Sequence, residues 1–317
     1  MEDEFLKNRF RSTLLGLAIG DALGAPLELM NQAEIAERFG VVREMLGGGW
    51  LNLEPGGVTD DTEMMICIAE SLAQKAEFDP DDIARKFLVW YDTHPKDLGN
   101  TTQVVLGLLK NDLYWRSAAK KAHAILGGKS AGNGSLMRVA PIGLVFHRYE
   151  EEMIKASFTS SKITHWDDIA AESCVAFNLI LSDILHGYDQ EEAIQNAAAK
   201  MLPRSEMVSR SIQSVFEKES DELQPTGFVL DTLETALWYF YHSESFEEAL
   251  VHAVNRGGDA DTIGAVTGAL AGAYFGMGEL PERWLKVLEG REIIQNLADQ
   301  LYEISNTLSL NKADSES

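Results

Sequence analysis

The chain has 317 residues, enough to bury a substantial hydrophobic core in one large domain or two. Its 27 Lys and Arg residues against 50 Asp and Glu residues give a formal net charge of −23. Because nucleic acids and anionic membranes are bound by clustered Lys and Arg, this balance argues against both as partners. An acidic protein can still bind a phosphate-bearing small molecule through metal ions and backbone N–H groups.

We expect neither a targeting signal nor a membrane span. Residues 1–5 lack the positive charge and apolar core of a signal peptide, and the longest weakly polar run, residues 263–277, is short for a membrane helix. The expected protein is cytoplasmic, is not inserted in a membrane, does not bind nucleic acid and is a monomer.

Nearly every segment of the chain is predicted to be helical. Helical patterns cover residues 4–24, 60–76, 81–93, 136–146, 164–187, 226–243, 246–255, 262–277 and 290–306. No alternating run is long enough for a strand, and no repeat or linker divides the chain. The sequence therefore predicts an all-α fold, with a single compact helical domain over residues 1–310 and a polar, frayed C-terminal tail over residues 311–317.

The first predicted helix carries a row of glycines. Gly16, Gly20 and Gly24 are four residues apart, so they lie on one face and allow another backbone to approach closely. The helix is predicted to end just before Glu28, and a glycine-rich loop then leads to Thr59. We expect this row to serve packing.

Two stretches place paired carboxylates and hydroxyls at predicted helix starts, namely residues 59–62 (Thr-Asp-Asp-Thr) and 259–262 (Asp-Ala-Asp-Thr). Asp and Thr at a helix start are ordinary capping residues, but together these side chains exceed what capping requires. Oxygen ligands in this number suit Mg²⁺, Mn²⁺ or Ca²⁺, and carboxylates brought together repel each other without a cation. If the two stretches cooperate, they join both ends of the chain in one body.

Five motifs occur in one order along the chain. They are residues 20–28 (Gly-Asp-Ala-Leu-Gly-Ala-Pro-Leu-Glu), 59–62 (Thr-Asp-Asp-Thr), 97–102 (Asp-Leu-Gly-Asn-Thr-Thr), 132–138 (Gly-Asn-Gly-Ser-Leu-Met-Arg) and 258–262 (Gly-Asp-Ala-Asp-Thr). Together they resemble the ADP-ribosylglycohydrolase family over roughly residues 10–290. The motif at 97–102 is most similar to the dinitrogenase reductase-activating glycohydrolase branch.

The resemblance implies an all-helical domain with two divalent cations, Mg²⁺ or Mn²⁺, that hydrolyses the bond between ADP-ribose and a protein side chain. The metal ligands implied by motif are Thr59, Asp60, Asp61, Asp259, Asp261 and Thr262. The substrate-binding residues implied in the same way are Asn100, Gly132, Asn133, Gly134, Ser135, Met137 and His165. In this scheme, N–H groups of the loop at 132–135 face the pyrophosphate, and His165 lines the adenosine or phosphate end.

The chemistry of an N-glycosidic bond assigns roles to two further carboxylates, Asp97 and Glu28. Such a bond breaks through an oxocarbenium-like transition state, so water and ribose must be oriented. Paired metals can hold ribose hydroxyls and lower the pKa of bound water. A carboxylate outside the metal shell then moves protons, and either Glu28 or Asp97 could do so. We favour Asp97 for engaging the substrate side chain, because a carboxylate pairs bidentately with a guanidinium. Glu28 then remains as the water-positioning base.

The predicted activity is hydrolysis of the N-glycosidic bond of ADP-ribosyl-arginine in an ADP-ribosylated protein or a small ADP-ribosyl conjugate. Two alternatives remain: a non-catalytic ADP-ribose-binding or structural member of the same fold, and a different two-metal hydrolase such as a phosphohydrolase. Residues 97–100 are equally typical of a simple turn, and His165 of a capping or core-edge histidine. Phe228 stands where arginine-directed relatives often carry Tyr, which removes one hydrogen bond to the substrate. Trp166 is a second departure, at the rim of the pocket.

Overall fold

The computed structural model describes residues 2–111 and 114–315, with side chains over 4–111 and 114–308. Its α-helices are α1 (Glu2–Gly24), α2 (Gln32–Phe39), α3 (Asp60–Lys75), α4 (Pro80–Tyr91), α5 (Asn100–Leu109), α6 (Trp115–Ile125), α7 (Ala140–Phe146), α8 (Glu150–Lys162), α9 (Asp168–Leu185), α10 (Gln190–Met201), α11 (Glu206–Gln213), α12 (Val229–Tyr241), α13 (Phe246–Asn255), α14 (Ala260–Phe275), α15 (Glu282–Val287) and α16 (Arg291–Ser315). The short 3-10 helices are η1 (Ala25–Leu27), η2 (Asn133–Ser135), η3 (Ser214–Phe216), η4 (Ser220–Glu222) and η5 (Met277–Glu279). Over the described ranges there is no β-strand, only isolated bridges, so the all-α prediction is confirmed.

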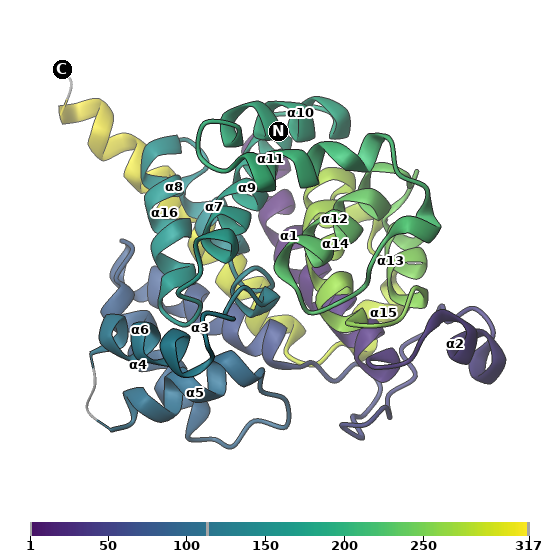
Figure 1. The fold of residues 1–317 in the computed structure, drawn as a ribbon. Coiled ribbons are helices and arrows are strands. Elements are labelled where there is room, and N and C mark those ends of the chain that lie inside the picture. Colours follow the sequence, from purple (N-terminus) through teal and green to yellow (C-terminus); the bar gives the residue numbers. More distant parts are fainter. Residues whose placement is uncertain (1, 112–113, 316–317) are drawn as a thin grey trace.

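Helices α1 and α14 pack against each other at the centre of the molecule (Figure 1), and their backbones touch. A Cβ built on Gly20 would lie only 1.9 Å from the carbonyl oxygen of Gly264, and one on Gly24 would lie 2.2 Å from that of Ala260. The two helices are therefore antiparallel, and the predicted close approach along the glycine row is confirmed. This pairing sets the end of α1 beside the start of α14.

The remaining helices surround this pair. Helices α12 and α13 pack on α14, α16 packs on α1 and α3, and α4, α5 and α6 form a group beyond α3 (Figure 1). One main cluster of buried apolar side chains runs through α1, α3, α7, α9, α12, α13, α14 and α16. No helix in the described part of the chain is long and apolar enough to cross a membrane.

The structure adds helices outside the predicted ranges, among them α6 and α8, and two further differences concern α2 and α16. Helix α2 interrupts the segment expected to be a loop, and its start is fixed by a capping box between Asn31 and Glu34. Helix α16 continues to Ser315, beyond the end predicted at residue 306 and into the segment expected to be frayed. This helix contains no Gly or Pro that would stop it.

Candidate active site

A buried carboxylate on α1 fixes the start of α3. The oxygens of Asp21 accept hydrogen bonds from the backbone N–H of Thr59 (3.0 Å) and of Thr62 (3.2 Å), and from the hydroxyls of both residues (3.0 and 2.5 Å). Free N–H groups at a helix start are thus satisfied by a side chain from another helix. As a result, the first residues of α3, Asp60 and Asp61, are held beside the end of α1.

The two acidic stretches meet at Asp61. One carboxylate oxygen, Oδ2, accepts from the hydroxyl of Thr262 at the start of α14 (3.3 Å). The same oxygen lies 3.2 Å from the Thr59 hydroxyl, whose single proton it shares with Asp21. The other oxygen, Oδ1, is buried and has no hydrogen-bond partner among the residues that the structure describes. Capping accounts for Thr59, whose hydroxyl accepts from the Asp61 N–H, but Asp259 makes no side-chain capping bond to α14. Capping is therefore not the role of the whole cluster.

Glu28 and Asp97 join the cluster from two loops. One carboxylate oxygen from each of Glu28, Asp97 and Asp261 lies within 4.8 Å of the others. The loop of Asp97 is tied to α3 because the N–H of Gly99 donates to Asp60 Oδ2 (3.3 Å). The two carboxylates predicted to be catalytic thus lie directly beside a predicted metal ligand.

Burial and mutual repulsion disfavour the charged forms of these carboxylates. Burial raises the pKa of Glu28 to about 7, and the neighbouring charges of Asp97 and Asp259 add to the shift. Burial also raises the pKa of Asp21 to about 6, although its hydrogen bonds act in the opposite direction. Burial first, and neighbouring carboxylates next, hold the pKa far above its ordinary value in Asp60, Asp61 and Asp261.

A divalent cation fits this donor set. None of these carboxylates forms an ion pair with a Lys or Arg within the described ranges. A buried carboxylate oxygen without a partner, such as Asp61 Oδ1, costs free energy unless a cation or a proton satisfies it. Carboxylate and hydroxyl oxygens are the ligands that Mg²⁺ and Mn²⁺ prefer.

The predicted substrate loop reaches this cluster through Asn133. Its side-chain amide donates to Asp259 Oδ2 and to the hydroxyl of Thr232, each at 2.8 Å. Its backbone N–H donates to the carbonyl of Gly227 (3.1 Å), which sets the loop against the segment before α12. The loop at 132–135 and the acidic cluster are therefore parts of one site.

The other predicted substrate residues occupy different positions around this loop. Asn100 is exposed at the start of α5. Ser135 is buried and its hydroxyl bonds that of Ser161 (2.8 Å), so its side chain points away from the site. Met137 is also buried, and its sulfur lies 4.0 Å from the hydroxyl of Thr262, so it packs against Thr262 from the core side. His165 lies beneath the loop and is 2% exposed.

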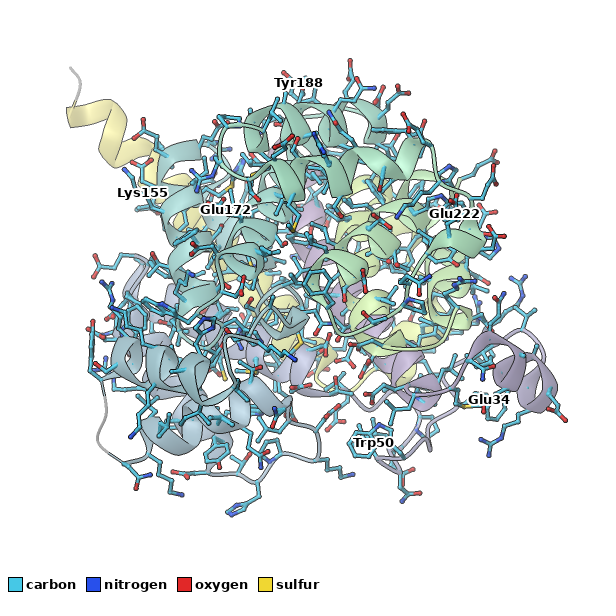
Figure 2. The ribbon with its side chains drawn as sticks, viewed as in Figure 1. Glu34, Trp50, Lys155, Glu172, Tyr188 and Glu222 are labelled. Atoms are coloured by element: carbon cyan, nitrogen blue, oxygen red, sulfur yellow. The ribbon has the colours of Figure 1, made fainter. Side chains whose placement is uncertain are left out.

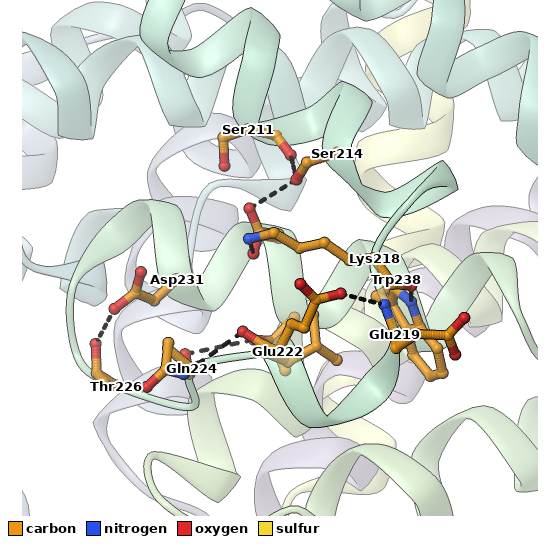
Figure 3. A network of polar contacts seen from close by, with 12 residues as sticks. Ser211, Ser214, Lys218, Glu219, Glu222, Gln224, Thr226, Asp231 and Trp238 are labelled. Atoms are coloured by element: carbon orange, nitrogen blue, oxygen red, sulfur yellow. Dashed lines mark hydrogen bonds and ion pairs between the residues drawn. The ribbon is translucent and has the colours of Figure 1, made fainter.

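Phe228 lies at the rim of the site, next to the substrate loop. It is 39% exposed, and its backbone pairs with that of Gly132. The segment leading to it is held by a hydrogen bond from the Thr226 hydroxyl to Asp231 (2.5 Å), and the preceding turn by one from Trp238 Nε1 to the Lys218 carbonyl (2.9 Å), as Figure 3 shows. The aromatic ring is thus carried by a well-bonded segment.

Comparison with known proteins identifies the family. The ADP-ribosylglycohydrolase family model matches residues 2–310. The chain belongs to this family. Its relatives include the ADP-ribosyl-[dinitrogen reductase] glycohydrolase of Rhodospirillum rubrum, which is 34% identical over 89% of this chain and 90% of that protein.

Further relatives differ in what their names say they act on. The ADP-ribosylarginine hydrolase Tri1 of Serratia proteamaculans is 32% identical over 93% of this chain and 79% of that protein, and human ADP-ribosylhydrolase ARH3 is 27% identical over 94% and 93%. A solved structure, titled ADP-ribosylglycohydrolase-related protein complex, superposes with a TM-score of 0.81 at 36% identity, covering 95% of this chain and 99% of that one. The ADP-ribosylglycohydrolase fold and the all-α architecture are therefore shown.

The sequence did not single out Trp50, which contacts the glycohydrolase site directly. Its indole Nε1 donates to Glu28 Oε2, and the residue is 55% exposed (labelled in Figure 2). Gly48 and Leu53 exchange backbone hydrogen bonds (2.7 and 2.9 Å) and close the turn that carries it. Gly49 packs so closely on η1 that an added Cβ would lie 2.9 Å from that backbone. Trp50 is thus rigidly placed to orient Glu28.

Replacing Trp50 with Phe is expected to lower kcat for ADP-ribose release roughly tenfold with little change in KM, because one hydrogen bond to a carboxylate is lost. Steady-state kinetics test this. The matched control is Trp115→Phe, which removes an equivalent bond from Nε1 to Asp81 (2.7 Å) on α4, away from the acidic cluster. Equal losses of kcat in both variants would contradict a role for Trp50 in orienting Glu28.

The acidic cluster also predicts how stability depends on pH. Because the carboxyl pKa values are raised, the folded protein binds more protons than the unfolded chain between about pH 4 and pH 7. This stabilisation is complete below the unfolded pKa and is lost as the pH rises through the folded values, about 6 for Asp21 and about 7 for Glu28. Below about pH 6.5 the buried imidazoles of His147 and His165, whose pKa values burial lowers to about 3, act in the opposite direction, so the carboxyls are tested above that pH. The Tm of EDTA-treated protein is therefore expected to fall from pH 6.5 to pH 8, and Mg²⁺ or Mn²⁺ should restore it at pH 8. A metal-free Tm that rises over this range would contradict the burial of these carboxyls.

Proposed function

We propose that this protein is a hydrolase dependent on two divalent cations, Mg²⁺ or Mn²⁺, that removes ADP-ribose from a modified arginine side chain by cleaving the N-glycosidic bond. The observation that carries the proposal is the meeting of the two acidic stretches at Asp61, whose buried Oδ1 has no hydrogen-bond partner in the described part of the chain. Membership in the family supports the hydrolase activity. The names of the Tri1 and Rhodospirillum rubrum relatives support an ADP-ribosylated protein as substrate.

In the proposal, six residues hold the cations: Thr59, Asp60, Asp61, Asp259, Asp261 and Thr262. When bound, the cations would supply Lewis-acid chemistry, polarising ribose hydroxyls and lowering the pKa of water. The residues of this chain then orient and move protons. Asp21 keeps Asp60 and Asp61 in position through its hydrogen bonds to the start of α3.

Glu28 and Asp97 have different proposed roles. With a pKa of about 7, the Glu28 carboxyl can both take and return a proton near neutral pH, which suits a general base acting on water. Trp50 occupies one of its oxygens and leaves the other for that water. Asp97 is half-buried beside Asp261, and its carboxylate would pair with the guanidinium of the substrate.

The other end of the substrate would lie on the loop at 132–135. Asn133 connects this loop to Asp259, so a bound ADP-ribose would extend from the acidic cluster, where its ribose reacts, towards Phe228. Phe228 offers a stacking surface but no hydroxyl. Asn100, exposed at the start of α5, would contact the reacting ribose or the side chain that leaves.

The test is release of free ADP-ribose from an ADP-ribosyl-arginine protein, in Mn²⁺, in Mg²⁺ and in EDTA, with an ADP-ribosyl-serine peptide in parallel. We expect metal-dependent release from arginine and much slower release from serine. Release from serine alone would overturn the arginine assignment. Binding of ADP-ribose without release from either substrate would support the non-catalytic alternative, and liberation of phosphate from ADP-ribose would support a phosphohydrolase.

A further inference from the structure

A chain of three buried side chains runs beneath the substrate loop. Nη2 of Arg138 donates to the hydroxyl oxygen of Thr164 (2.5 Å), and the same hydroxyl bonds Nδ1 of His165 (2.8 Å). All three residues are almost completely buried. Within the described residues, no other hydrogen bond is made by the Thr164 hydroxyl or by the His165 ring.

The donors available decide where the protons lie. A guanidinium can only donate, so the Thr164 hydroxyl accepts from Arg138 and has one proton of its own to give. If Nδ1 of His165 carried a proton, the buried Thr164 proton would have no acceptor, which is costly. The hydroxyl therefore donates to Nδ1, and the single imidazole proton lies on Nε2.

The surroundings keep this ring neutral. Burial first, and the charge of Arg138 next, lower the pKa of His165 to about 3. Arg138 is fixed against the Phe87 ring (4.4 Å to its centroid) and the sulfur of Met64 (3.3 Å). Burial lowers its pKa only to about 10, so Arg138 remains charged at neutral pH. The ring can thus offer one N–H donor and no charge.

Nε2 faces the glycines of the loop. A Cβ on Gly132 would lie 3.5 Å from Nε2, and one on Gly134 would lie 3.3 Å from Nε2 and 3.0 Å from Cε1. Side chains at these positions would cover this edge of the ring, and glycine leaves it open. Nε2 lacks a hydrogen bond within the described residues but does not belong to the fully buried unpaired atoms, so it keeps some access to solvent.

We propose that Arg138 and Thr164 are positioning residues that hold His165 as its Nε2–H tautomer, and that this N–H donates to an acceptor oxygen of ADP-ribose lying on Gly132 and Gly134. The ligand in this inference rests on the proposed function, whereas the tautomer rests on the hydrogen bonds alone. Because the imidazole is neutral, its N–H can bond either an uncharged or an anionic oxygen. It adds no positive charge to a site that is otherwise lined by carboxylates.

The first test is the tautomer itself, read from long-range ¹H–¹⁵N spectra of the imidazoles in the ¹⁵N-labelled, Mg²⁺-loaded full-length protein. The His165 signals are assigned by their loss in His165→Gln. We expect an unprotonated Nδ1 and a protonated Nε2 from pH 6 to pH 8. In Thr164→Val the Nδ1 lone pair loses its donor, so the Nδ1 signal should shift downfield and the ring should no longer be held in one orientation, whereas Thr164→Ser keeps the hydroxyl and should keep the native pattern. A native ring protonated on Nδ1, or a Thr164→Val spectrum equal to the native one, would overturn the proposal.

The second test is calorimetric binding of ADP-ribose to the same proteins. Thr164→Val should weaken binding about tenfold, since the ring is no longer held with Nε2–H towards the loop, and Thr164→Ser should bind like the native chain. An altered spectrum with unchanged affinity would overturn the contact with ADP-ribose and leave the positioning role intact. A native protein that binds no ADP-ribose would refute the proposed function, while the spectra would still decide the tautomer. If Thr164→Val unfolds, the native spectrum and Thr164→Ser decide the tautomer.

Discussion

Replacing Asp61 with Asn is expected to reduce ADP-ribose release by at least about a thousandfold, because metal-assisted charge stabilisation contributes several kcal/mol to such reactions. The same change should raise the Tm of the EDTA-treated protein. Without a cation, Asp61 is buried among like charges, and Asn removes one of them while keeping the shape. Activity assays and thermal melts with and without Mn²⁺ measure both effects.

In Asp61→Asn the activity should fall while the Tm of the EDTA-treated protein rises. These opposite changes distinguish a functional role of Asp61 from a structural one. The control is Asp189→Asn, at the capping box that starts α10, where Asn and Asp are comparable caps and neither quantity should change. Loss of activity together with a lower metal-free Tm would mean that the Asp61 carboxylate holds the fold and would contradict the cation site.

Replacing Gly20 with Ala is expected to destabilise the protein by about 3 kcal/mol, even though Ala is the better helix former. The new Cβ would meet the carbonyl oxygen of Gly264 at 1.9 Å, so α1 and α14 must move apart. The movement should also weaken Mn²⁺ binding, because Asp21 and Asp261 lie at the ends of these two helices. Chemical denaturation and equilibrium dialysis test the two consequences.

Gly107→Ala is the matched control for Gly20→Ala. Gly107 lies inside α5, and an added Cβ there would meet nothing within 4 Å. This variant should gain up to about 1 kcal/mol from helix propensity without any effect on metal binding. A Gly20→Ala protein as stable as the native one would contradict the close contact between α1 and α14.

The sequence alone predicted those features of the fold and the site that depend on residues close together along the chain. The glycine spacing on α1 specifies one helical face, and this alone indicates a close partner. The paired carboxylates at two helix starts indicate a cation site because their charge cannot be explained by capping. The starts of α3 and α14 were predicted from the same residues to within two positions, since Asp and Thr mark where a helix begins.

Other parts of the site could not be predicted because they depend on contacts between distant segments. Asp21 lies within a recognised motif, but only the packing of α1 against α3 shows that its carboxylate serves the start of α3. Trp50 lies beside Glu28 because a closed turn folds back on η1. Ser135 and Met137 belong to the loop motif, yet their side chains point into the core. The direction in which such a side chain points cannot be predicted from hydrophobic periodicity or from composition.

The central claim is that residues 59–61 and 259–262 together bind divalent cations, and anomalous diffraction tests it most directly. Crystals grown with MnCl₂ would be measured on both sides of the manganese absorption edge. We expect two anomalous peaks at the acidic cluster, within bonding distance of oxygens of Asp60, Asp61 and Asp261. Peaks only elsewhere, or no peak at the cluster in crystals grown at saturating MnCl₂, would contradict the account.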